Sequence, residues 1–270
     1  MLIISTSAAA DNAAFFAAIA NAERRALHSY FDQHVVADEE AGYITIDAAV
    51  SNDIFYFNYR PLGIRDNLSI TAADGSKVEP ESMVQGKLRT VFDANLQAAG
   101  TYRLAIANAS MMASWKEGGE TKRWRGPQAE MADKVPAKAD ELTIRESVSR
   151  LETFVTVGRP TDVKPTGQGL ELVPVTHPND LYEDSPAVFS FVVDGKPAAG
   201  IEVEMIRAGT RYRDQLEKIT LTTNADGQIS HTWQHPGMYY LKAGVTGKSE
   251  TMENVERRLS YVTTLEVLAQ

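Results

Sequence analysis

The chain contains no cysteine in its 270 residues. This absence excludes disulfide bonds, thiolate zinc sites and cysteine nucleophiles. No apolar run is long enough to cross a bilayer as a helix, so we do not expect an integral membrane protein. Positive charge is in the minority, with 27 Lys and Arg against 36 Asp and Glu and a net charge of −9. Because this field repels phosphate backbones, we expect no binding to nucleic acids.

The common catalytic motifs are missing as well. The sequence has no Gly-x-Ser-x-Gly elbow, no phosphate-binding loop and no His-Glu-x-x-His zinc motif. Pairs of carboxylates occur throughout an acidic chain and do not identify a glycosidase by themselves. We therefore predict that the protein is not an enzyme.

What the sequence does have is the alternation that is typical of β-strands. The clearest example lies within Gly169–Arg213, where an Asp-Gly-Lys-Pro turn at Asp194–Pro197 separates the runs Val188–Val193 and Ile201–Met205. An Asp-Gly turn between runs with a period of two is the strongest short-range signal of a hairpin. This region is therefore predicted to belong to a β-sandwich, a scaffold that more often binds than catalyses.

Strand-like segments separated by Gly and Asp turns recur through most of the chain. Ile54–Tyr59 is predicted to be one of these strands, aromatic and buried. The pattern breaks at Gln128–Ala139, which is predicted to be a short helix followed by a loop, and Gly158–Gly169 is rich in Gly and Pro, as connections between domains often are. We predict an all-β chain of two β-sandwich units, residues 36–160 and residues 168–270.

A short echo relates the two predicted units. Ala73–Gly75 and Ala225–Gly227 are both Ala-Asp-Gly turns, and each is followed by a strand. In each unit a glycine, Gly100 or Gly237, then begins a strand that contains tyrosine. The echo predicts that both units close a hairpin in the same way.

The first 35 residues allow two interpretations. Ala13–Ala22 is rich in alanine and ends in Ala-Asn-Ala, the small-x-small pattern of an export cleavage site, although Asp11 interrupts the apolar segment and no basic residue precedes Arg24. The same stretch also fits a helix that begins near Asn12. Residues 1–35 are therefore expected to be either a degenerate signal segment or an N-terminal helix.

Seven segments carry motifs that can be compared with known families: Val50–Phe57, Glu120–Gly126, Gly169–Leu181, Asp194–Gly200, Thr210–Asp214, Asn224–Gly227 and Pro236–Leu241. Together they resemble a bacterial family that is filed as domain of unknown function 4198. The resemblance extends from Ile44 to the C-terminus.

The resemblance implies an Ig-like β-sandwich for the second unit and export to the periplasm. It also implies a part in nickel or cobalt uptake, in which the partner would be a metal-uptake transporter or an outer-membrane receptor. Family members typically begin their mature chain with Ala-His, whereas this chain has Ala22-Glu-Arg at the corresponding place, with His28 and His34 displaced. No metal ligand is carried over from the family for this reason. We hypothesise that residues 1–35 are a divergent or wrongly translated N-terminus, which resequencing tests.

Four residues are the candidates for a metal site: His177, Asp180, His231 and His235. The two later histidines have the i, i+4 spacing of a helical metal pair, but a strand would place them roughly 13 Å apart at about 3.3 Å per residue. Coordination needs both nitrogens about 2 Å from one ion, so a structural role is the alternative. His177 precedes Pro178 in a turn beside Asp180, which either holds a divalent cation such as nickel or cobalt or forms an ordinary polar loop.

Two cationic segments also have competing interpretations. Arg211 and Arg213 would share one face of a strand, which favours a charged outer face or a salt-bridge network over a site. Lys122–Arg125 mixes cations with Trp124, so cation–π packing at a domain junction is the simpler interpretation. Binding of a sugar or an anion by Trp115 and Trp124 is the alternative.

The leading functional hypothesis is an exported periplasmic ligand-binding protein that binds a divalent metal, nickel or cobalt, for an uptake system. Its physical basis would be a rigid sandwich that presents histidine and carboxylate side chains from its loops. The alternative is a non-enzymatic structural or interaction module whose sheet edges or tryptophan-bearing loops bind a protein or a glycan. The sequence does not distinguish which metal or which partner is involved.

Overall fold

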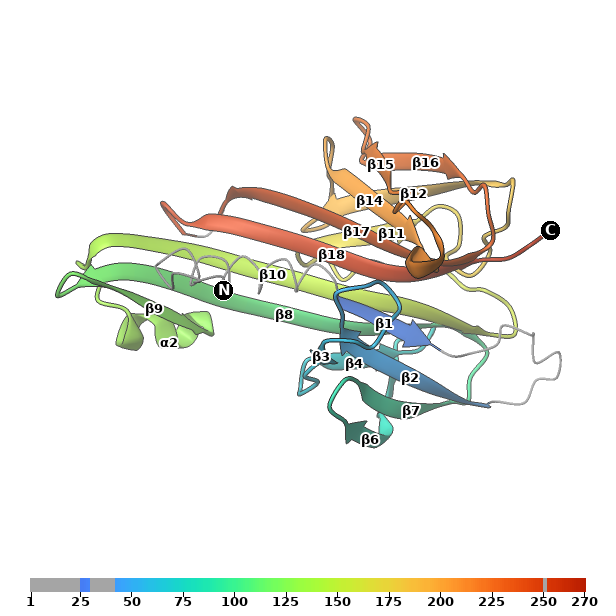
Figure 1. Cartoon of the computed structure of the whole chain (residues 1–270), viewed down its shortest axis with the longest axis horizontal. Helices are drawn as coiled ribbons and strands as arrows, with labels where there is room; N and C mark the ends of the chain where they lie inside the picture. The colour runs from blue at the N-terminus through green and yellow to red at the C-terminus, as the bar shows by residue number, and fades with distance from the viewer. Residues whose placement is uncertain (1–24, 30–41, 250–251) are drawn as a thin grey trace, which may run out of the picture.

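The computed structural model describes residues 25–29, 42–249 and 252–270. Within these residues the regular secondary structure is almost entirely β-strand, in three sheets, with one α-helix and one turn of 3-10 helix (Figure 1). The predicted all-β fold class is confirmed. None of the helices in the described part is long and apolar enough to cross a membrane.

The N-terminal sheet has strand order β1-β2-β7-β6, with β3 paired to β2, and all of its strand pairs are antiparallel. Alternation sets its two faces, because every second residue of β7 is buried. Its strands are β1 (Arg25–Ser29), β2 (Gly42–Val50), β3 (Arg60–Pro61), β6 (Glu81–Gln85) and β7 (Thr90–Leu96).

The central sheet is the largest of the three and takes strands from both halves of the chain. Its order is β15-β14-β17-β18-β10-β8-β4-β5, with β9 paired to the outer part of β8. The β10–β18 pair is parallel and joins the two halves side by side. Its strands are β4 (Leu68–Thr71), β5 (Lys77–Val78), β8 (Gly100–Glu117), β9 (Glu120–Gly126), β10 (Asp140–Val157), β14 (Glu202–Arg207), β15 (Ile219–Thr222), β17 (Gly237–Lys248) and β18 (Glu256–Val267).

The C-terminal sheet is small and antiparallel. Strand β12 lies in its middle, between β11 on one side and β16 on the other, and it also pairs with the short β13. Its strands are β11 (Leu170–Pro174), β12 (Pro186–Val193), β13 (Lys196–Pro197) and β16 (Gln228–Thr232).

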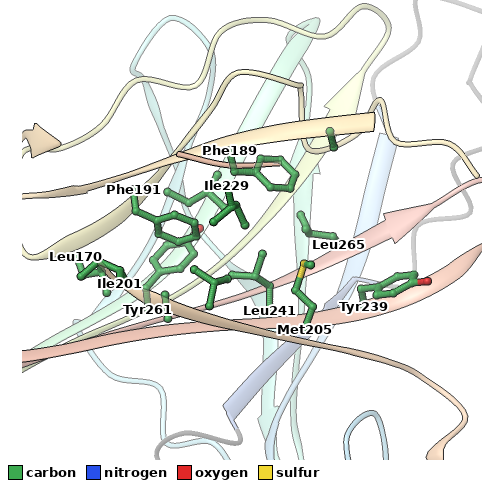
Figure 2. Close-up of a cluster of buried hydrophobic side chains, with 14 of the residues drawn as sticks. Leu170, Phe189, Phe191, Ile201, Met205, Ile229, Tyr239, Leu241, Tyr261 and Leu265 are labelled. Atoms are coloured by element: carbon green, nitrogen blue, oxygen red, sulfur yellow. The ribbon is translucent and has the colours of Figure 1, made fainter. Parts of the chain in front are cut away.

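The central sheet is buried on both faces where the other two sheets cover it. Tyr240 and Val262 lie in the core shared with the N-terminal sheet, whereas Tyr239, Leu241 and Tyr261 lie in the core shared with the C-terminal sheet (Figure 2). Successive residues of a strand point to opposite faces, so the consecutive apolar residues of β17 supply both cores. The N-terminal sandwich is therefore completed by strands β17 and β18, which the C-terminal half of the chain contributes.

This shared sheet bears on the expected domain organisation. Residues 158–169 contain no strand or helix, as predicted for a connection, but the parallel β10–β18 pair crosses that boundary. The division into units 36–160 and 168–270 stays a prediction. Of the expected helix or signal segment at 1–35, only residues 25–29 are described, and they form β1; the rest of that expectation lies outside the described residues.

The predicted hairpin at Asp194 is confirmed at its turn and wrong in its second strand. Asp194 and Gly195 both have positive φ, 49° and 79°, as a type I′ turn requires. The returning partner of β12 is only the two-residue β13, after which Gly200, at φ 74°, turns the chain away. The run Ile201–Met205 then enters the central sheet through β14. Its apolar side chains face those of β12 across the core instead of lying beside them (Figure 2).

The long strands β8 and β10 form an arm that extends beyond both cores (Figure 1). Each has 18 residues, which corresponds to roughly 60 Å of extended chain. The predicted helix after Gly126 is confirmed as α2 (Gln128–Lys134). It packs on the arm around Trp115, Trp124 and Met131, in a third and smaller core.

Candidate functional site

The predicted ligand His177 lies at the junction between the two halves of the chain. Its Nε2 atom is 2.9 Å from the Oγ1 atom of Thr101, the second residue of β8, and its Nδ1 atom is 3.1 Å from the backbone nitrogen of Asn179. The Asn179 N–H can only donate, so Nδ1 accepts and the ring proton resides on Nε2. Both ring nitrogens are therefore already in hydrogen bonds within the protein.

These bonds belong to a closed chain of donors and acceptors. Thr101 Oγ1 accepts hydrogen bonds from the backbone N–H of Thr161, at 3.0 Å, and from Nε2 of His177. The hydroxyl proton of Thr101 is then free to be donated to Thr156 Oγ1, which lies 3.0 Å away. Thr156 in turn donates to Asn179 Oδ1 at 2.9 Å. Burial lowers the pKa of His177, which keeps the ring neutral as this arrangement requires.

The other candidate metal ligands lie in separate surroundings. Asp180 is exposed, one turn from His177, and its charge acts on the imidazole by raising its pKa against the effect of burial. His231 is in β16 and packs edge-on against the buried Trp233, with ring centroids 5.2 Å apart. His235 is exposed at the bend after β16, where its carbonyl accepts from the hydroxyl of Tyr239 at 2.8 Å.

Among the described residues, no group of three or more His, Cys, Asp or Glu side chains is placed to hold a metal ion. Coordination by His177 would also replace one of its two existing hydrogen bonds. Metal binding by His177, Asp180, His231 and His235 stays a prediction.

A second polar cluster at the junction is buried and charged. Glu152, only 1% exposed, accepts hydrogen bonds from Arg150 and from the hydroxyl of Tyr261, both at 3.0 Å, and Arg103 lies 3.6 Å away. Burial raises the pKa of Glu152, and the two guanidinium groups act against that shift. Every charge in this cluster is thus opposed by a partner, which is the condition for burying it.

The same cluster holds the connecting segment 158–169 in place. Glu171 accepts backbone hydrogen bonds from Thr166, Gly167 and Gln168, at 2.8, 2.7 and 3.2 Å. Arg150 donates to the Thr166 hydroxyl at 2.8 Å. Glu171 and Arg150 are thus bonded to the protein's own atoms, whereas the buried Nε atom of Arg103 has no hydrogen-bond partner among the described residues and interacts with Glu152 through charge alone. The cluster is therefore best described as a structural network.

A further group of polar and aromatic side chains lies elsewhere, on the loop that follows β2. The prediction that Ile54–Tyr59 forms a buried strand is wrong: this segment is a loop. Its polar neighbours compete with strand pairing, because Asn58 donates to Asp53 at 2.7 Å and accepts from Ser51 at 2.6 Å. Phe55 has the positive φ of 64°, which is uncommon for a bulky residue and typical of functional loops.

Arg211 of the other half of the chain closes over this loop. Its guanidinium lies 4.0 Å from the centroid of the Tyr56 ring, and its Nη2 atom lies 3.1 Å from Oδ2 of Asp53. The prediction that Arg211 and Arg213 share a strand face is wrong, because Thr210–Tyr212 forms the 3-10 turn η1 after Gly209, which has φ 80°.

Arg213 turns instead toward its own loop and donates to the carbonyls of Ala208 and Arg207, at 2.7 and 2.8 Å. Beside Arg211, the Tyr212 ring is 86% exposed, and on the facing loop Tyr59 is 46% exposed. We call the contacting group Asp53, Tyr56 and Arg211, together with the exposed Tyr59 and Tyr212 of the same two loops, the tyrosine–arginine surface. It combines flat rings, a guanidinium and a carboxylate at the solvent boundary.

Sequence reasoning missed this surface, although a signal was present. Val50–Phe57 and Thr210–Asp214 are two of the segments that carry the family resemblance, and they are far apart in sequence but meet here. The tryptophans considered for sugar binding do not contribute. Trp115 is buried, and the ring of Trp124 lies against Gly126, where an added Cβ would be 2.5 Å from it.

The structure is thus an all-β, three-sheet protein in which exposed loops from the two halves of the chain meet through Arg211, Asp53 and Tyr56. The family described as Domain of unknown function (DUF4198) matches residues 28–247. The chain therefore belongs to that family.

Similarity to solved structures is remote. The D0-D1 domain of intimin is 12% identical, with 84% of this chain and 90% of that chain covered and a TM-score of 0.23. Red sea bream transglutaminase is 10% identical, with 96% of this chain and 34% of that chain covered and a TM-score of 0.16. No curated protein matches the chain.

Proposed function

We propose that this protein is an exported, non-enzymatic binding protein that recognises a partner protein through the tyrosine–arginine surface. The observation that supports this most directly is the contact of Arg211 with both Tyr56 and Asp53. It holds a guanidinium and an aromatic ring in a fixed relation at the solvent boundary. Tyrosine and arginine, with tryptophan, are enriched among the side chains that dominate binding energy at protein interfaces.

The arrangement favours binding over catalysis. Asp53 and Arg211 are each nearly half exposed, at 44% and 48%, so water screens their charges. Enzymes stabilise transition states with preorganised groups in sites from which water is excluded. Exposed rings of Tyr59 and Tyr212 instead offer large, rigid contact area at a low entropy cost.

Site-specific photocrosslinking in the producing cells tests the proposal. A photoreactive phenylalanine analogue at Tyr212 or at Tyr59 is expected to give a discrete crosslinked product. The matched control is the same analogue at Tyr43, which is 60% exposed on β2, away from this surface. The product at Tyr212 should be lost when Arg211→Ala is added. A product of the same mass and yield at Tyr43, or none at either test position, contradicts the proposal.

A role in nickel or cobalt handling is the second candidate, and it rests on the family resemblance and on the nearness of Asp180 to His177. Calorimetric titration of the full chain with nickel, cobalt and copper tests it, together with His177→Ala and His231→Ala. Binding that is tighter than millimolar and lost in one of these variants supports the metal role. No such binding removes it and leaves the protein-binding proposal intact.

A further inference from the structure

The arm, together with β9 and the adjoining ends of β17 and β18, presents a second surface on one face of these five neighbouring strands. Cross-strand pairing places Arg125, Met112, Arg145, Glu256 and Lys248 in a single row from β9 to β17. Directly paired residues lie on the same face of a sheet. Five strands at about 4.8 Å spacing make this row roughly 19 Å wide.

The neighbouring rows are built from hydroxyl groups and further arginines. On one side Arg123 pairs with Ser114, and on the other Ser147 pairs with Arg258. Side-chain contacts place these groups on one face: Arg125 donates to Ser110 at 3.3 Å. Ser114 and Thr143 are also joined, with their hydroxyl oxygens 2.7 Å apart.

The charge of this face is opposite to that of the chain. These three rows contain five cations, Arg123, Arg125, Arg145, Lys248 and Arg258, and one carboxylate, Glu256, in a protein whose net charge is −9. Glu256 is bracketed by ion pairs with Arg145 and, at 3.7 Å, with Arg258. Arg123, Arg125 and Lys248 are exposed. Of the described residues, none of the large hydrophobic side chains that are exposed belongs to these strands.

The arginine- and hydroxyl-rich composition of this face fits an acidic polysaccharide better than it fits a protein or a membrane surface. Interfaces between proteins are built around buried aromatic or aliphatic anchors, and membrane surfaces are held by apolar insertion beside lysine clusters. The face has neither. Planar guanidinium groups match carboxylate and sulfate oxygens in bidentate fashion, and the interleaved serine and threonine hydroxyls donate to the same oxygens or to sugar hydroxyls.

We infer that this face of the arm, formed by Arg123, Arg125, Arg145, Lys248, Arg258 and the hydroxyl groups between them, binds a linear acidic polysaccharide. The chain of sugars lies across the strands, so that successive acidic groups meet successive cations of the row. The inference is independent of the proposed function, because the tyrosine–arginine surface lies on other loops and shares no residue with this face.

Binding of the full chain to dextran sulfate and to polygalacturonate, with neutral dextran as the control ligand, tests the inference. The test variant carries Arg123→Gln, Arg125→Gln and Lys248→Gln. The matched variant carries Lys77→Gln, Lys87→Gln and Lys196→Gln, three exposed lysines elsewhere, so that the change in net charge is the same.

The test variant should weaken binding to the acidic polymers about tenfold, as expected from three exposed charge contacts of about 0.5 kcal/mol each, and the matched variant by less than twofold. Neutral dextran should not bind. Absence of binding by the unmodified protein, or equal weakening in both variants, overturns the inference. So does binding to vesicles of phosphatidylglycerol that is at least as tight as binding to the polysaccharides.

Discussion

The imidazole of His177 is joined to the hydroxyl of Thr101, with Nε2 and Oγ1 2.9 Å apart, and this bond links the loop after β11 to the start of β8. The partners come from opposite sides of the connecting segment 158–169. Their bond continues through Thr156 and Asn179 back to the same histidine. This chain of hydrogen bonds at the junction therefore depends on the protonation state of one side chain.

Acid should weaken this junction. Burial holds the pKa of folded His177 below its ordinary value of 6.5, so its stabilising contribution is complete above pH 6.5 and is lost as the pH falls through the lower folded pKa. His177→Ala should lower the free energy of unfolding by about 1–2 kcal/mol at pH 7.5, and by less at pH 5. Urea unfolding of both proteins between pH 5 and pH 8 measures the difference.

The matched control for this experiment is His235→Ala, at the exposed bend after β16. Its difference from the unmodified protein should stay within about 0.5 kcal/mol, as for surface substitutions in general. A cost of His177→Ala that is the same at pH 5 and at pH 7.5 would contradict the link between protonation and the junction.

Removing the buried carboxylate at the same junction should cost more. Glu152→Ala leaves Arg103 and Arg150 without their shared buried partner, and breaking such a pair typically costs about 3–5 kcal/mol. Tyr261→Phe removes only one neutral donor to Glu152 and should cost about 1 kcal/mol. Denaturant midpoints at constant slope measure both. Equal costs for the two variants would mean that the ion pairs contribute nothing beyond the hydrogen bond.

The sequence predicts local structure here better than long-range pairing. The Asp194 turn was correct, and so was the part of the echo in which Gly100 and Gly237 begin β8 and β17, with nearly the same φ of 125° and 129°. The prediction that both units close a hairpin in the same way was wrong. Strands β4 and β5 pair across the first Asp-Gly turn, whereas β15 and β16, on either side of the second, belong to different sheets. Alternation identified the apolar face of Ile201–Met205 but not its partner. Alternation of apolar and polar residues with a period of two determines which side chains are buried. It does not determine whether the strand lies beside β12 or across the core from it.

The candidate surface was harder to predict for a related reason. The contact of Arg211 with Asp53 joins segments 158 residues apart, and no local pattern encodes such a meeting. The aromatic run Ile54–Tyr59 has strand composition, but Ser51 and Asn58 bind the loop's own polar groups and prevent the pairing. The aromatic composition of this segment favours a strand, whereas the hydrogen bonds of the Ser51 and Asn58 side chains favour a loop. The structure shows that the loop is formed.

Two turn glycines should differ sharply in their tolerance of alanine. Gly227 and Gly195 have similar φ, 75° and 79°, so both substitutions carry a backbone cost of about 1–2 kcal/mol. An added Cβ at Gly227 would also lie 2.6 Å from the carbonyl oxygen of Phe191, whereas at Gly195 the nearest atom is 3.9 Å away. Gly227→Ala should therefore lower the free energy of unfolding by at least about 2 kcal/mol more than Gly195→Ala. Thermal and urea unfolding measure both, and equal losses would contradict the steric argument.

Arg211 should matter little for stability, in contrast to its expected role in binding. Its ion pair with Asp53 is exposed, so a double-mutant cycle with Arg211→Ala and Asp53→Ala should give a coupling energy below about 1 kcal/mol. Stacking on Tyr56 adds about 0.5–1 kcal/mol at such a site. Arg211→Lys keeps the charge but loses the planar group, so it should retain most of the coupling to Asp53 and lose part of the stacking. A cost of 3 kcal/mol or more for Arg211→Ala would instead assign this arginine to holding the two halves of the chain together, and its effect on crosslinking at Tyr212 would then report unfolding.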